Sequence, residues 1–397
     1  MAFEGGYTVP SQSQFVAAKC ADLTEFLSGD AVKDYPNLAN IPTYAWEGMG
    51  RMGGKIYGVP IHRPRIAYAM FADGNKADAA GLVGGMSLST QDFQNGLLRL
   101  KSPGHFALGD CVTLPFGYRV HAANAGAPNV WRLDNGTFVS TYGTDEFKQS
   151  LVTMQSFWSK GLWDPDVLSM PATQMKTLFA NGTTATVADG WGGYAGYVNS
   201  AHGSFPVKIM RLYGTKPTPW FGTGNFGFTA LKQAPPERVK MLLRVLDFLA
   251  SPFGSKEWEL VNYGLEGVHF NRGADGGPSV PTALGATENR TNVPFVYIAS
   301  APKVIYNPGN ADASREAYQA EQDMVPIGVD NPAVPYLAGS ATYSTKWATL
   351  DSQINDAITG IVTGRQPLSS WDGVVKQFRS RGGDQIADEL AKQHAAR

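Results

Sequence analysis

The stretch from Met175 to Tyr194 constrains the fold more than any other part of the sequence. A short helix is expected to end at Ala180, because the pair Asn181-Gly182 is best able to adopt the left-handed conformation that closes a helix. The run Thr183 to Ala188 is small, β-branched and apolar, which is typical of a buried strand. This predicted strand ends abruptly at Asp189-Gly190-Trp191-Gly192-Gly193-Tyr194.

The end of this predicted strand is a candidate binding site. In open α/β sheets, ligands bind just beyond the carboxyl ends of strands. Glycines let the backbone approach a ligand closely, and Trp191 and Tyr194 offer flat apolar faces with a polar edge. Asp189 offers a carboxylate that accepts hydroxyl protons. The alternative is a tight turn whose rings cover the strand end and whose aspartate bonds its own backbone. The stretch alone leaves both interpretations open.

Length and charge narrow the class of protein. A chain of 397 residues predicts two domains, each able to bury a sizeable core. Charged residues make up 17% of the chain and the formal net charge is −1. Binding to a phosphate backbone needs concentrated basic charge, so we expect no nucleic-acid partner. The aromatic residues are plentiful enough to line a pocket.

The sequence carries no signature of a metal, a cofactor or a membrane span. The two cysteines, Cys20 and Cys111, are too few for a zinc site or a disulfide framework, and the six histidines lack metal-ligand spacing. No P-loop and no G-x-S-x-G motif occurs. No apolar run has the length of a transmembrane helix. The start, Met1 to Tyr7, lacks the basic and apolar segments of a signal peptide.

Several motifs, taken in order, resemble the family 1 extracellular solute-binding proteins of sugar ABC importers. The run Gly54 to Pro60 resembles the family's GK-x-YG-x-P signature. Phe179 to Ala185, leading into Asp189-Gly190-Trp191, resembles its F-x-x-G-x-x-A-M strand, with Thr186 in place of the methionine. Further matches are Asn225 to Phe228, Phe248 to Glu257, Tyr263 to Val268, Gly364 to Pro367 and Gly382 to Asp384. The last two are most similar to the lipoprotein-type members.

The resemblance implies a two-lobe α/β fold of the type II periplasmic-binding-protein kind, with ligand held in the cleft between the lobes. Lobe 1 is expected at residues 1–69 and 226–323, and lobe 2 at 70–225 and 324–397. Family members begin with a signal peptide and a strand–helix–strand portion of lobe 1 that this chain does not show. We therefore expect lobe 1 to be incomplete, with an exposed sheet edge.

A sugar site needs aromatic faces for ring stacking and planar polar groups for hydroxyls. His62, Arg63 and Arg65 follow the glycine–proline turn near the predicted hinge, and the arginine fork suits hydroxyl or carboxylate groups. Their alternative is a salt bridge or a solvated face. The remaining candidates are Trp220 and Phe221 before the second crossover, Glu266 in a glycine-bracketed loop, and Tyr336 and Trp347 on the return into lobe 2. Core packing is the alternative for the aromatic residues, and a cap for Glu266.

The resemblance implies a non-catalytic, monomeric carrier that captures a sugar or oligosaccharide outside the cytoplasm. It would deliver this ligand to the permease subunits of an ABC importer and reach the membrane only through a lipid anchor that this chain lacks. The rival is a carbohydrate-active hydrolase, which needs two carboxylates roughly 5–9.5 Å apart across a cleft. Asp189 with Glu266 is the pair to test. A sensor that presents ligand to a receptor is the third interpretation.

Overall fold

The computed structural model describes residues 2–4, 12–85, 87–109, 115–201, 203–291 and 294–396; Cys111 lies outside them. The chain forms two compact units. Unit 1 comprises Met1–Arg65, Thr223–Ala311 and Val334–Thr345, and unit 2 comprises Ile66–Gly222, Asp312–Ala333 and Lys346–Arg397. The expected crossovers lay at 69/70, 225/226 and 323/324. The units change at 65/66, 222/223 and 311/312, and the chain visits unit 1 once more before it ends in unit 2.

Unit 1 is built on a small antiparallel sheet. Its described strands are β1 (Ala2–Glu4), β12 (Asn225–Thr229) and β4 (Val59–His62), in the order β1-β12-β4. All four residues of β4 are buried, so its sequence does not alternate between polar and apolar residues; three are apolar, and the fourth is His62. The other strands of unit 1 are β2 (Arg51–Met52), β3 (Lys55–Ile56), β13 (Phe270–Asn271) and β14 (Val280–Pro281).

Helix α11 (Pro236–Leu249) supplies one wall of the unit 1 core. It begins with a proline in its first turn and buries Val239, Leu243 and Leu246, as its apolar stripe predicts. The Asp247 side chain accepts hydrogen bonds from the backbone of Asn37 and Leu38 at 2.8 and 3.0 Å. The remaining helices of unit 1 are α1 (Gln12–Lys19), α2 (Thr24–Leu27), α3 (Pro36–Ala39), α4 (Thr43–Gly48), α12 (Lys256–Tyr263), α13 (Ala283–Thr291) and α15 (Val334–Leu337).

Gly58, in the glycine–proline motif, is fixed by a close approach to the sheet. A Cβ atom at this position would overlap the ring of Phe228, which is fully buried on the neighbouring strand β12. We therefore predict that Gly58→Ala lowers the free energy of unfolding by about 1–3 kcal/mol, as overpacking in a dense core does. Urea denaturation followed by circular dichroism measures this loss.

Gly373→Ala is the matched control for this substitution. Gly373 lies in helix α17 (Trp371–Phe378), and nothing lies within contact distance of the Cβ position. Alanine there should leave stability unchanged or raise it by about 0.5–1 kcal/mol, since glycine weakens helices. Equal effects of the two substitutions would contradict the packing explanation for Gly58.

Unit 2 is built on a second antiparallel sheet, of order β10-β5-β9, made by β10 (Val207–Ile209), β5 (Tyr68–Asp73) and β9 (Thr186–Gly190). Helix α9 (Ala172–Ala180) ends at the predicted residue. The predicted strand at Thr183 instead begins at Thr186, because Thr183 and Thr184 first bridge to the segment around Phe106. A 3₁₀ turn at Trp191–Gly193 and helix α10 (Tyr194–Ser200) follow the strand.

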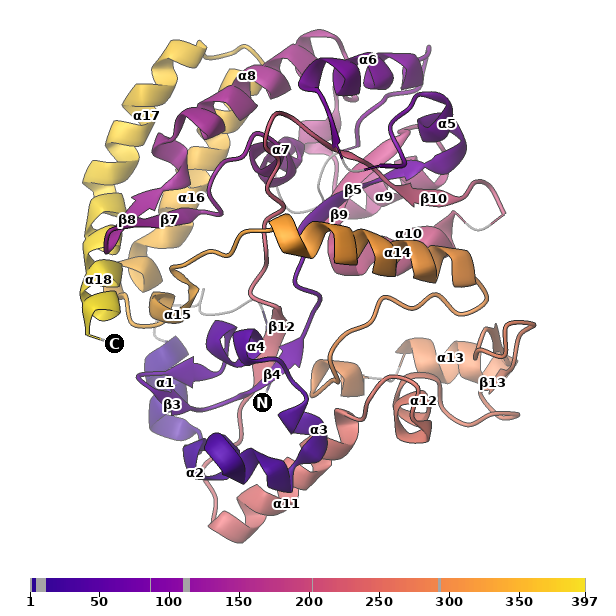
Figure 1. The fold of residues 1–397 in the computed structure, drawn as a ribbon, viewed down its shortest axis with the longest axis vertical. Helices are drawn as coiled ribbons and strands as arrows, with labels where there is room; N and C mark the ends of the chain where they lie inside the picture. Colours follow the sequence, from indigo (N-terminus) through magenta and orange to yellow (C-terminus); the bar gives the residue numbers. More distant parts are fainter. Residues whose placement is uncertain are drawn as a thin grey trace. The chain divides into compact units, whose positions relative to one another are not determined.

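Helices cover the remainder of unit 2, and Figure 1 shows α8, α16 and α17 running along one another. Lys148 of α8 (Asp145–Ser159) pairs with Asp372 of α17, and Gln155 bonds to the end of α16 (Ala341–Val362). Thr144 caps α8, because its hydroxyl accepts a hydrogen bond from the N–H of Phe147. The other helices are α5 (Gly74–Ala79), α6 (Thr90–Leu100), α7 (Tyr118–Asn124), α14 (Ala311–Met324) and α18 (Asp384–Ala395). The other strands are β6 (Ser87–Leu88), β7 (Trp131–Asp134), β8 (Thr137–Ser140) and β11 (Leu212–Tyr213).

Within the described ranges of both units, no helix combines the length and apolarity that crossing a bilayer needs.

Candidate functional site

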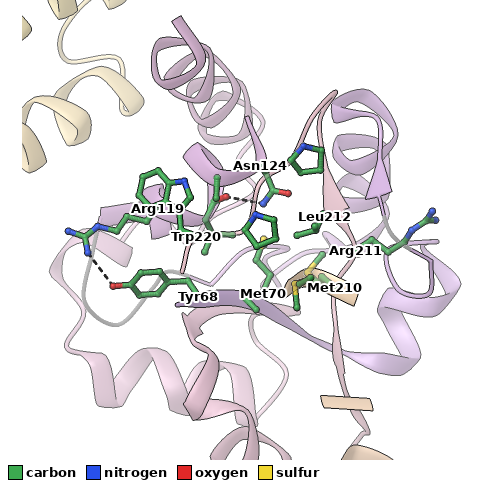
Figure 2. A pocket seen from close by; sticks show the side chains of 14 residues that line it. Tyr68, Met70, Arg119, Asn124, Met210, Arg211, Leu212 and Trp220 are labelled. Carbon is green, nitrogen blue, oxygen red and sulfur yellow. Dashed lines mark hydrogen bonds between the residues drawn. The ribbon is translucent and has the colours of Figure 1, made fainter. Parts of the chain in front are cut away.

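A pocket in unit 2 lies beside the start of β5; its volume, counted with the open solvent at its mouth, is about 480 Å³ (Figure 2). Three chain segments are held together there. Tyr68, the first residue of β5, pairs with Gly190, the last residue of β9. The backbone of Ala67 accepts a hydrogen bond from the N–H of Trp191 and donates one to the carbonyl of Trp220. The end of β9, where the sequence predicted a site, therefore adjoins this pocket.

The polar side of the pocket is organised by Arg119 of α7. Its guanidinium donates to the Tyr68 hydroxyl at 3.2 Å and lies 4.0 Å from a carboxylate oxygen of Asp351 on α16. That carboxylate also accepts from Asn355 and from Tyr142. The side chains of Arg119 and Asp351 are 23% and 22% exposed, so both can be reached. Burial alone would lower the pKa of Arg119, but the adjoining tyrosines, led by Tyr118, raise it well above its usual value.

The apolar side of the pocket is formed by methionine side chains and by Trp220. The residues on this side are Met70, Met210, Leu212, Trp220 and Met324. The Trp220 indole donates to the carbonyl of Ala127 at 2.8 Å, which fixes its ring. Its neighbour Phe221 is buried, and its backbone bonds to Val329 and Asn129. Of these two predicted residues, only Trp220 lines the pocket.

The three residues predicted at the end of β9 turn into packed surroundings. Trp191, Asp189 and Tyr194 are 1%, 7% and 0% exposed. The Tyr194 hydroxyl donates to the carbonyl of Val207 at 2.9 Å, and burial raises its pKa above the usual value. Asp189 accepts from the Tyr197 hydroxyl and from its own neighbour Gly190, both at 2.7 Å. These contacts agree with the alternative interpretation, a tight turn whose rings cover the strand end and whose aspartate bonds its own backbone. The Trp191 Nε1 is buried without a hydrogen-bond partner among the described residues.

Unit 1 has a pocket of its own beside β4, with a volume of about 620 Å³ when the open solvent at its mouth is counted. Its polar lining includes two of the predicted residues, His62 and Arg63, together with Lys303 and Ser300. Its aromatic lining is formed by Trp258 of α12 and by Tyr297. The segment around Ser300 is held against β4 by a parallel bridge to Ile61.

His62 is a neutral structural group. Its Nδ1 accepts the backbone N–H of Lys303 at 2.6 Å, so the ring proton must sit on Nε2. The Nε2–H then donates to the Tyr44 hydroxyl at 2.9 Å. Burial, assisted by the charges of Arg63 and Lys303, lowers the pKa of His62 to about 4. The imidazole therefore positions the Lys303 backbone and carries no charge at neutral pH.

The two predicted arginines stack on aromatic rings of unit 1. The guanidinium carbon of Arg63 lies 4.8 Å from the ring centre of Phe226 and 5.9 Å from that of Tyr297. That of Arg65 lies 5.2 Å from the ring centre of Tyr44. Stacking leaves the in-plane N–H groups of a guanidinium available for other partners. Arg63, which lines the pocket, is thus pre-oriented for a ligand.

The last three predicted residues lie elsewhere. Glu266 pairs with Arg272, whose guanidinium also holds Glu259, so its carboxylate belongs to a surface ion-pair cluster. Tyr336 is buried on α15 in unit 1. Trp347 is half-buried in unit 2, with its ring 6.5 Å from that of Trp131. Trp347 precedes Asp351 by four residues on α16, so both occupy one face of that helix.

Sequence reasoning missed the polar groups that the pockets bring together. Arg119 and Asp351 are separated by more than two hundred residues, and Tyr68 lies far from both in the sequence. Arg119 had one local signal, since it follows an aromatic residue after a glycine turn. Lys303 is the single basic residue in an otherwise apolar stretch of the sequence, and this isolated charge was also a local signal of a site.

The paired-carboxylate alternative finds no support in these sites. Asp189 lies in unit 2 and Glu266 in unit 1, and each is engaged by partners of its own unit. Neither pocket is lined by an aspartate or a glutamate. Across the part of the chain that the structure describes, no group of three or more His, Cys, Asp or Glu residues is arranged to hold a metal ion.

Two α/β units, each with a small sheet and a pocket, define the two-lobe architecture of solute-binding proteins. No family model matches the chain. It is 25% identical to the polygalacturonan/rhamnogalacturonan-binding protein YtcQ of Bacillus subtilis over 379 residues, which is 91% of this chain and 74% of YtcQ. It is also 25% identical to lipoprotein LipO of that organism, over 91% of this chain and 75% of LipO.

The solved structures agree with these relatives. An HMO-binding, ABC-transporter-associated solute-binding protein from Bifidobacterium longum infantis superposes with a TM-score of 0.68 at 16% identity, covering 96% of this chain and 84% of that one. The chain thus has the fold of solute-binding proteins and is similar in sequence to YtcQ and LipO, and its motifs resemble those of the family 1 extracellular solute-binding proteins. The relatives are binding proteins and lipoproteins.

Proposed function

We propose that this protein is the solute-binding component of an ABC importer, which captures an oligosaccharide outside the cytoplasm and delivers it to a membrane permease. The observation that carries the proposal is the unit 2 pocket, which sets the linked polar groups of Tyr68, Arg119 and Asp351 beside an apolar wall. The relative YtcQ, which binds polygalacturonan and rhamnogalacturonan, supports a glycan as the ligand.

This arrangement suits saccharide chemistry. The Arg119 fork donates to ring and exocyclic oxygens, and the neighbouring Asp351 carboxylate supports the guanidinium charge. The apolar wall, with Trp220 behind it, receives the C–H face of a sugar ring. No aspartate or glutamate lines the pocket to act as the acid or base of a glycosidase, so we propose binding without turnover. We further propose that the protein acts as a monomer held at the cell surface by a lipid anchor.

A thermal-shift screen tests this function. The panel should hold neutral and acidic oligosaccharides, because ligand binding raises the apparent stability by mass action. At least one oligosaccharide should raise the melting temperature and be recovered intact by mass spectrometry. Recovery of shortened products would support the hydrolase instead. No shift across a broad panel would contradict saccharide capture altogether.

A further inference from the structure

We infer that the unit 1 pocket is a carboxylate-binding subsite, which makes the protein selective for acidic saccharides. The inference rests on the proposed function and names its substrate class. The first observation is charge composition. The lining of the pocket includes His62, Arg63 and Lys303 but no aspartate or glutamate. Since His62 is neutral, the pocket carries two positive charges and no compensating negative one.

These two charges lack ion-pair partners in the described part of the chain. No described carboxylate lies within 4 Å of Arg63 or Lys303, although fourteen other pairs form. Lys303 is partly buried, and burial together with the charge of Arg63 lowers its pKa. Two like charges held in one half-buried pocket are costly unless an anion joins them. A ligand carboxylate would remove that cost.

The cations are positioned before any ligand arrives. The Arg63 guanidinium is stacked on Phe226 and Tyr297, which holds its plane. The backbone of Lys303 is fixed by its hydrogen bond to His62. The Ser300 hydroxyl also lines the pocket, and it is buried without a hydrogen-bond partner among the described residues. A fork, an ammonium and a hydroxyl donor thus line one pocket.

The aromatic lining indicates that the ligand bearing the carboxylate is a sugar. Trp258 and Tyr297 border the same pocket and offer ring faces to a pyranose. A uronic acid carries its carboxylate on a pyranose ring, so it can fill both the charged and the aromatic parts of the pocket. An inorganic anion has no ring and can fill only the charged part. Acidic saccharides should therefore bind better than neutral ones of the same length, and better than free phosphate.

Isothermal titration calorimetry with trigalacturonate and with its fully methyl-esterified, uncharged form tests the inference. The wild type should bind the acid about 10- to 100-fold more tightly than the ester. This ratio of affinities corresponds to the free energy of one charge-assisted hydrogen bond. Lys303→Met and Arg63→Met should each remove most of this preference, lowering the affinity for the acid more than the affinity for the ester. Arg238→Gln, on the exposed face of α11, is the matched control and should keep the preference.

The other outcomes overturn the inference. If acid and ester bind equally, or if Lys303→Met keeps the preference, the subsite assignment is wrong while saccharide capture stands. If inorganic phosphate at matched ionic strength displaces trigalacturonate, the pocket is a general anion site. If neither these nor any neutral saccharide binds, the proposed function falls and the inference falls with it. Thermal melts of both variants confirm that a lost preference is not lost folding.

Discussion

Arg119→Met is expected to weaken saccharide binding by about 10- to 100-fold, because the guanidinium is the central donor of the unit 2 pocket. It links Tyr68 and Asp351, and removing it deletes a charge-assisted fork and leaves the Asp351 carboxylate without its neighbouring cation. A hydrogen bond to a charged group contributes about 1.5–3 kcal/mol, which sets this range. Calorimetric titration with the best ligand of the thermal-shift screen measures the change.

Two further variants separate the fork from the charge. Arg119→Lys keeps the cation but loses the planar fork, so we expect it to recover only part of the affinity. Arg132→Met removes an exposed arginine of unit 2 that pairs with Asp134, and it should bind as the wild type does. Undiminished affinity of Arg119→Met would move the binding site away from this pocket.

The second large effect expected is a loss of stability in mild acid. Burial lowers the pKa of both His62 and His121 to about 4, from an ordinary value of 6.5. In the unfolded chain these rings take up a proton below pH 6.5, whereas in the folded protein they stay neutral until about pH 4. Their contribution is therefore complete above pH 6.5 and is lost as the pH falls from 6.5 to 4. A shift of this size corresponds to about 3 kcal/mol for each histidine.

Urea denaturation at pH 7, 5.5 and 4 measures this dependence. His62→Gln should be less stable than the wild type at pH 7, since it breaks the contacts to Tyr44 and Lys303, but its stability should fall less steeply with acid. His105→Gln, at an exposed position, should follow the wild-type slope. A wild-type stability that is constant from pH 7 to 4 would show that neither imidazole is held neutral.

A local signal in the sequence was sufficient for one helix end. The pair Asn181-Gly182 closes α9 through contacts within a few residues, so a short-range pattern predicted where that helix ends. Two of the family motifs also meet in the structure, since Gly58 of the glycine–proline motif packs against the ring of Phe228. These predictions depended on residues near in sequence or on family motifs.

Side-chain direction at the candidate site could not be predicted in the same way. Tyr194 turns inward because Phe71 and Val207 lie beneath it, and neither is near it in the chain. The pocket groups Arg119 and Asp351 meet only when α16 returns to α7. Such contacts are set by long-range packing, which leaves no trace in a local pattern.

The most direct test of the account is a calorimetric titration of the wild-type protein with an acidic oligosaccharide, followed by recovery of the ligand. We predict saturable binding of one ligand per chain, with the oligosaccharide recovered at its original length. An absence of binding heat with acidic and neutral oligosaccharides alike, or recovery of a shortened product, would contradict the assignment of this protein as a saccharide carrier.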